Sequence, residues 1–315
     1  MKHILSRTEF CYWLDNNFVW SPFFKITNLC NYCCAHCCER SGPNEAPTFI
    51  PISDVRAITE DFKYTKNKMP IAIVSGGEPM MVYNHAPHYM SQIMKTLTRA
   101  GFTIELKTNA GWTMTDKAPV IFGDLEQFFV KNPTAYFSYH LSLDRFHPQS
   151  KQTTIEFLRW FYQNDKLSRR ANVHIFYDAP EFLTDTFVQL ADKYEILLDM
   201  EKRPTNEFAK IGANLFRGKE KYIVIEPYHG IDNRGRARDN GIATKQNSIM
   251  KSFAKPGDVH AITFDNFGNS YFDCASDRVK TPYRNARGKI KPIEQIKREL
   301  FNLLYDKYVA EEMAK

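Results

Sequence analysis

Between about residues 22 and 200, short apolar segments alternate with longer segments whose apolar residues recur at helical spacing. This alternation is typical of βαβ units and predicts a mainly parallel sheet. The predicted strands are Phe23–Thr27, Ile71–Ser75, Phe102–Thr108, Ala135–Leu143, Asn172–Tyr177 and Ile196–Met200. The predicted helices begin near Ser53, Pro87, Lys117, Lys151 and Pro180. Six strands with five intervening helices predict an α/β fold in the form of an open, partial parallel (β/α)6 barrel.

Two of these strands carry polar side chains on one face only. The polar positions are Glu105, Lys107 and Asn109 in and after the third strand, and Ser138, His140, Ser142 and Asp144 in and after the fourth. Parallel barrels place their ligand sites at the C-terminal ends of the strands, so we expect Asn109, Ser142 and Asp144 to face a ligand. The alternative is an exposed strand face on an incomplete barrel.

After about residue 205 the pattern changes. It predicts a strand at Tyr222–Glu226, a loop rich in Gly and Arg, a hairpin at Ala261–Cys274 and a final helix from about Pro292. We therefore expect a core domain of residues 1–205 and a small C-terminal α+β appendage of residues 206–315.

Composition and charge narrow the class of protein. The chain has 315 residues, of which 43% are hydrophobic and 25% are charged, as in ordinary globular proteins. It has no apolar run long enough to span a membrane, and charged residues interrupt Met1–Trp20, so we expect a cytoplasmic protein without a membrane partner. A net charge of +6 and the arginines at 234, 236 and 238 are weak evidence for nucleic-acid binding; a solvated loop is the preferred interpretation.

The cysteines are the main chemical signal. Five of the seven lie within residues 30–38, and this clustering predicts metal ligation rather than a disulfide framework. Cys30, Cys34 and Cys37 have the spacing C-x3-C-x2-C. Iron–sulfur clusters normally take four thiolates, so three on one loop would leave one iron open to another ligand. The rival is a structural zinc site built from the pairs Cys30/Cys33 and Cys34/Cys37, but these pairs abut, which would strain a tetrahedral site.

The spacing of the three cysteines, after Thr27-Asn28-Leu29, resembles that of the radical S-adenosylmethionine (AdoMet) superfamily. Further segments are similar to those of the family in the same order. Gly76, Gly77, Glu78 and Pro79 resemble the segment that binds the amino group of AdoMet; Thr108-Asn109 and Ser142-Leu143-Asp144 resemble segments at the ends of the third and fourth strands. His36 stands where the family usually has an aromatic residue, and an imidazole can still stack near the adenine.

The resemblance implies a [4Fe-4S] cluster on Cys30, Cys34 and Cys37, with AdoMet on the open iron. It further implies that the reduced cluster cleaves AdoMet to methionine and a 5′-deoxyadenosyl radical, which takes hydrogen from an unactivated C–H bond. An external electron donor of the flavodoxin or ferredoxin type would be the protein partner. Cys33 and Cys38 are surplus to the motif, and we expect them to be small buried packing residues.

The C-terminal third is similar to the SPASM and twitch extensions of peptide-modifying family members. The similarity rests on residues 262–274, on Gly235-Arg236-Ala237 before them and on the helix after them. Cys274 is the only cysteine after residue 38, so we expect no auxiliary cluster. Cys274 either packs within the hairpin or donates a hydrogen atom to a substrate radical.

This resemblance favours a peptide or peptide-like substrate. The alternative is epimerisation or rearrangement of a small polar metabolite such as an aminosugar. A hypothesis of another class is a zinc-stabilised, non-enzymatic nucleic-acid module that uses Arg234–Arg238 as its contact.

Overall fold

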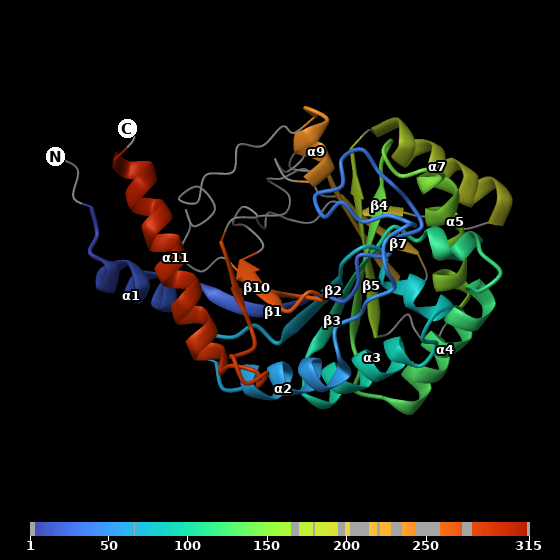
Figure 1. Cartoon of the computed structure of the whole chain (residues 1–315). Coiled ribbons are helices and arrows are strands. Elements are labelled where there is room, and N and C mark those ends of the chain that lie inside the picture. Colours follow the sequence, from blue (N-terminus) through green and yellow to red (C-terminus); the bar gives the residue numbers. More distant parts are fainter. Residues whose placement is uncertain are drawn as a thin grey trace.

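The computed structural model describes residues 4–65, 67–164, 170–178, 180–194, 199–201, 214–218, 221–227, 235–242, 259–272 and 279–313. In these residues the strands form one sheet in the order β11-β10-β9-β1-β2-β3-β4-β5-β8-β7-β6 (Figure 1). The strands are β1 (Val19–Lys25), β2 (Ile71–Ser75), β3 (Thr103–Thr108), β4 (Phe137–Leu143), β5 (Ala171–Tyr177), β6 (Asp199–Glu201), β7 (Asn214–Gly218), β8 (Lys221–Pro227), β9 (Val259–Asp265), β10 (Asn269–Phe272) and β11 (Lys280–Pro282). The helices of the sheet's outer side are α2 (Ile52–Phe62), α3 (Tyr89–Arg99), α4 (Ala118–Lys131), α5 (Ser150–Gln163) and α7 (Pro180–Tyr194) (Figure 1).

The centre of the sheet is parallel. Strands β9, β1, β2, β3, β4, β5 and β8 pair in parallel, whereas β10 and β11 at one end and β7 and β6 at the other pair antiparallel. The predicted mixed α/β class and the first five predicted strands are confirmed. Among the described strands, β11 and β6 remain the two ends of an open sheet, so closure of a barrel is not seen.

Burial along the strands explains why the sheet has a polar inner face. Burial alternates residue by residue in β3 and β4, and Leu106, Tyr139 and Leu141 on the covered face are fully buried. Helix α3 supplies a matching apolar stripe, since Met90, Ile93, Met94 and Leu97 are fully buried at helical spacing. The polar residues of both strands therefore lie on the opposite, inner face, as the alternation predicts.

The sixth parallel strand differs from the prediction. Of the predicted strand Ile196–Met200, residues 196–198 lie outside the described residues, and β6 beyond them pairs antiparallel with β7. The place beside β5 is taken by β8, with Val173 opposite Ile223. Ile223 and Ile225 are fully buried there. Their β-branched side chains fit a central strand that is covered on its outer face. The prediction of 196–200 as the sixth barrel strand was wrong.

The strands predicted for the appendage continue the same sheet. Strand β9 pairs in parallel with the whole of β1, and β10 then forms the predicted hairpin with β9. Helix α11 (Ile293–Met313) packs beside α1 (Arg7–Asn17), the helix that precedes β1 (Figure 1). No helix in the described part of the chain combines the length and the apolar character that crossing a membrane requires.

Candidate cofactor site at the cysteine loop

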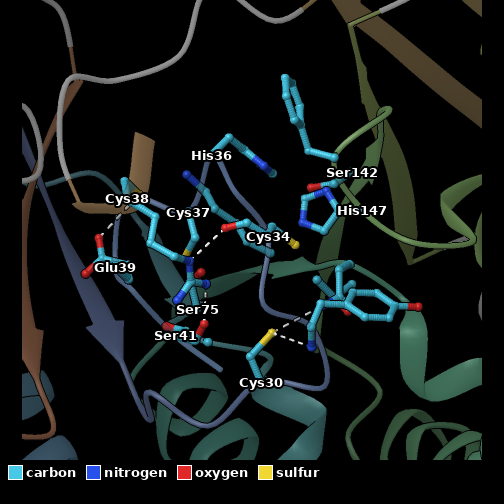
Figure 2. Close-up of a pocket in the computed structure, with 18 of the residues that line it drawn as sticks. Cys30, Cys34, His36, Cys37, Cys38, Glu39, Ser41, Ser75, Ser142 and His147 are labelled. Carbon is cyan, nitrogen blue, oxygen red and sulfur yellow. Dashed lines mark hydrogen bonds between the residues drawn. The ribbon is translucent and has the colours of Figure 1, made fainter. Parts of the chain in front are cut away.

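The loop of residues 30–41, called the cysteine loop here, follows β1 and lines a cavity of about 500 Å³. Cys30, Cys34 and Cys37 all line this cavity (Figure 2). Cys30 and Cys34 are buried and Cys37 is half-buried. The three predicted ligands are therefore brought to one cavity.

The two surplus cysteines behave differently from each other. Cys33 is exposed and is not among the lining residues, so the prediction that it packs in the interior was wrong. Cys38 is half-buried, lines the cavity, and its thiol lies 3.5 Å from Glu39 Oε1. The difference follows from the loop, which turns Cys33 outward while its neighbours face inward.

The surroundings of Cys30 disfavour its thiolate form. Burial raises the pKa of the Cys30 thiol to about 12, and the charges of Glu78, Cys34 and Cys37 add to the rise, while the Tyr32 N–H opposes it. Ionising Cys30 here without a cation would therefore be costly. A bound metal centre removes this cost, because thiolates rather than thiols are the ligands of metals.

The two glycines at the end of β2 let this strand end approach the cysteine loop. Gly77 N donates to Thr27 O at 2.7 Å, and a Cβ at Gly77 would lie 2.2 Å from Leu29 O. Gly76 has φ +131°, and a Cβ there would lie 2.3 Å from Thr27 O. Both glycines also line the cavity. Only glycine fits these two positions, because any side chain would meet backbone atoms.

Glu78 joins two strand ends. It is fully buried, and its carboxylate accepts bonds from Thr108 Oγ1 at 2.8 and 2.9 Å, Asn109 N at 2.8 Å and Met80 N at 3.1 Å. Burial raises its pKa to about 7, although these hydrogen bonds lower it. The carboxylate is thus occupied by the protein and does not line the cavity. Pro79 is also buried and begins the 3-10 helix η1 (Pro79–Asn84).

The end of β3 contacts the first cysteine directly. Asn109 Nδ2 lies 3.5 Å from Cys30 Sγ and donates to Asn31 Oδ1 at 2.9 Å. Thr108 and Asn109 both line the cavity, and both are nearly buried. The predicted Thr-Asn pair therefore lies beside the first predicted metal ligand.

The loop after β4 brings a histidine that the sequence did not single out. Ser142 lines the cavity, whereas Asp144 is fully buried and does not. Asp144 Oδ2 lies 2.8 Å from His147 Nδ1. His147 and Cys34 both line the cavity (Figure 2). His147 is three positions after Asp144, a spacing that could have indicated the pair. Asp144 thus reaches the site through His147.

The charges of these groups are set by one another. Burial lowers the pKa of His147, but the bonds to Asp144 and Cys34 outweigh it and raise the value to about 10. Burial raises the pKa of Asp144, but the bond and charge of His147 bring it below its ordinary value. These mutual interactions favour the protonated form of His147 beside the ionised form of Asp144.

His36 lies against the same group. Its ring centroid is 4.7 Å from that of Phe146 and 4.9 Å from that of His147. Burial, followed by the charge of His147, lowers the pKa of His36 to about 4, and its Nδ1 is buried without a partner among the described residues. A buried polar nitrogen at a cavity wall fits a site that receives a polar ligand.

Three further predicted residues are Cys274, Arg234 and Arg236. Cys274 and Arg234 fall outside the described residues. Arg236, which the sequence placed in a solvated loop, is half-buried and lines the cavity, so that interpretation was wrong for this residue.

Neither a scan against models of protein families nor a search of curated proteins gives a match. Among solved structures, anSMEcpe with bound AdoMet matches with a TM-score of 0.44 and 12% identity, covering 90% of this chain and 80% of that chain. The form with AdoMet and Kp18Cys peptide gives a TM-score of 0.41 at 12% identity over 90% and 80% of the two chains. The form with AdoMet and Cp18Cys peptide gives 0.33 at 14% identity over 50% of this chain and 43% of that chain. At these scores the likeness does not define the family, so the function is inferred from the residues of this chain.

Proposed function

We propose that this protein is a radical AdoMet enzyme that holds a [4Fe-4S] cluster on Cys30, Cys34 and Cys37. The observation that carries the proposal is the meeting of these three thiols at one cavity. The other walls of that cavity are the segments whose sequence resembles the AdoMet-binding segments of the superfamily, represented by Gly76, Gly77, Thr108, Asn109 and Ser142.

The three thiols fit a [4Fe-4S] cluster, and the cavity fits AdoMet. Three thiols on one loop suit an iron–sulfur cluster with one iron left for a further ligand. The cavity of about 500 Å³ lies within the range of about 300–1,000 Å³ that small ligands and cofactors occupy. Gly76 and Gly77 line the cavity, and the buried Nδ1 of His36 offers a polar contact for a nucleoside or an amino acid moiety.

The reduced cluster would supply the electron that splits AdoMet into methionine and a 5′-deoxyadenosyl radical able to take hydrogen from an unactivated C–H bond. The protein's own residues would hold and orient the cofactors. Cys30, Cys34 and Cys37 would bind the iron. Glu78 fixes the ends of β2 and β3, and Asn109 orients Cys30. His36 and Phe146 form a half-buried ring pair suited to an adenine.

The substrate we propose is a peptide or peptide-like molecule, and a flavodoxin or ferredoxin would deliver the electron. The β9–β10 hairpin supports this choice, because it occurs where the sequence resembles the extensions of peptide-modifying enzymes. A small polar metabolite such as an aminosugar is the alternative. A peptide and an aminosugar, each deuterated at its unactivated carbons, separate the two: deuterium in 5′-deoxyadenosine from the peptide alone supports the proposal, and from the aminosugar alone contradicts it.

Metal and sulfide analysis after anaerobic reconstitution tests the cluster. We expect about four iron and four sulfide per chain in the wild type, and a loss of most of both in Cys30→Ala, Cys34→Ala and Cys37→Ala. Cys33→Ala is the matched control, since Cys33 belongs to the same loop but is exposed. Its content should equal that of the wild type. One zinc per chain without sulfide would contradict the proposal and favour the structural zinc site.

A further inference from the structure

The short helix α9 (Gly235–Asp239) lies against the cysteine loop, with Arg236 placed 202 positions from Cys34 in the chain. The backbone N–H of Arg236 donates to Cys37 O at 2.9 Å. Its side-chain Nε donates to Cys34 O at 2.8 Å, and its terminal nitrogen donates to Ser41 O. One residue thus binds three carbonyl groups spread over the loop.

Neighbours of Arg236 add two more contacts. Asn240 Nδ2 donates to Ala35 O at 2.9 Å. At the end of the loop, Arg40 forms a two-pronged ion pair with Asp239 at 2.8 to 3.1 Å. These contacts make α9 and the residue after it a second support for the loop, independent of β1 and β2.

The loop has little regular structure of its own. Among the described residues, and apart from the bond from Arg236 N, the bonds between backbone groups that involve its cysteines are Cys30 N to Gly42 O at 3.0 Å and Cys37 N to Cys34 O at 3.2 Å. Ordering each residue of such a segment costs conformational entropy. Buried carbonyl groups also need donors. Arg236 meets both needs, because its fork binds two carbonyls at once and its backbone binds a third.

We propose that Arg236 is a positioning residue, which holds the cysteine loop in the conformation that turns Cys30, Cys34 and Cys37 toward the cavity. Its guanidinium also lines this cavity, where a positive charge opposes the repulsion between thiolates. The predicted C-terminal region is in this way part of the cofactor site. The inference rests on the proposed function only where it concerns the cluster; the ordering of the loop stands by itself.

Hydrogen exchange of the chain without cofactor tests the ordering. In Arg236→Ala, peptides that cover residues 30–41 should exchange at least about tenfold faster than in the wild type, because the two hydrogen bonds from the guanidinium are lost. Arg236→Lys keeps the charge but loses the fork, so it should exchange several-fold faster. Arg238→Ala is the control, since Arg238 is exposed and pairs with Asp239 at 3.7 Å. It should match the wild type.

Peptides from β3 report whether the variants remain folded. If β3 is unprotected in Arg236→Ala, the lysine variant decides, because it preserves the charge and most of the packing. Wild-type exchange at residues 30–41 in a folded Arg236→Ala or Arg236→Lys would overturn the proposal.

A second readout concerns the cluster. After anaerobic reconstitution, a chelator should remove iron about tenfold faster from Arg236→Ala than from Arg238→Ala. The loss of visible absorbance measures this rate. Equal rates would overturn the role toward the cluster. If exchange rises as expected but the wild type itself forms no cluster, the positioning role stands and the proposed function fails.

Discussion

At the scale of single residues, the site depends on contacts that leave no room for change. Gly77 lies against Leu29 O, and Gly76 has a left-handed backbone beside Thr27 O. A well-packed contact of this kind cannot relax without moving the cysteine loop, because both sides are backbone. The positions that meet the cavity are therefore fixed partly by glycines that bear no chemistry.

Gly77→Ala should lower the free energy of unfolding by about 3 kcal/mol, because its Cβ would lie 2.2 Å from a backbone oxygen. Gly123→Ala is the matched control: Gly123 is in helix α4, and a Cβ there meets nothing within 4 Å. Alanine should stabilise that helix by about 0.5–1 kcal/mol. Urea unfolding of the chain without cofactor measures both, and equal effects would show that the close approach is wrong.

Glu78 gives a prediction about pH. Its pKa is raised by burial from an ordinary value of 4.5 to about 7. Its contribution to stability is therefore fully present below pH 4.5 and is lost as pH rises through 7. Glu78→Gln lacks this titration. Between pH 5 and pH 8, the unfolding free energy of the wild type should fall by about 2 kcal/mol more than that of Glu78→Gln, by order of magnitude. Identical pH profiles in urea unfolding would contradict the buried carboxyl.

What the sequence could predict of the site follows from the range of each contact. The cysteine spacing, the two glycines and the pair Thr108-Asn109 are local motifs, and all line the cavity. His147 and Arg236 were missed because they reach the site through loop placement that no short pattern specifies. Glu78 was predicted to receive an amino group, but a fully buried carboxylate is more stable with backbone donors, and the structure gives it those.

At the scale of elements, chain order and pairing partner are separate questions. Five strands of the predicted core, and the strand and hairpin of the predicted appendage, could be predicted from local patterns, since such patterns depend on neighbours along the chain. The placement of β8 beside β5, and of β9 beside β1, depends on long-range pairing that a single sequence does not encode locally. The sheet therefore extends further than the predicted barrel on both sides.

Helix α11 contacts the N-terminal segment through a buried lysine. Lys297 on α11 is 1% exposed, and its Nζ lies 2.6 Å from Asp15 Oδ1 and near the ring of Trp20. Lys297→Ala removes one partner of this pair, so it should lower the unfolding free energy by about 2 kcal/mol. Lys95→Ala, at an exposed position of α3, should change it by less than about 0.5 kcal/mol. Thermal or urea unfolding distinguishes them, and equal losses would contradict a stabilising role for the buried Lys297.

At the scale of the whole molecule, the open parallel sheet gathers residues from positions between 30 and 236 at one cavity. The cysteine loop follows β1, the other motifs follow β2, β3 and β4, and Arg236 comes from beyond β8. Parallel strands present their C-terminal ends at the same edge, which explains why motifs far apart in sequence meet there. The central claim is that this edge binds AdoMet at a cluster held by three thiols.

Anaerobic incubation of the reconstituted protein with AdoMet and dithionite tests that claim most directly, with 5′-deoxyadenosine quantified by chromatography. The wild type and Cys33→Ala should form 5′-deoxyadenosine, whereas the variant with alanine at positions 30, 34 and 37 should form none above background. No product from the wild type, or equal product from the triple variant, would contradict the account.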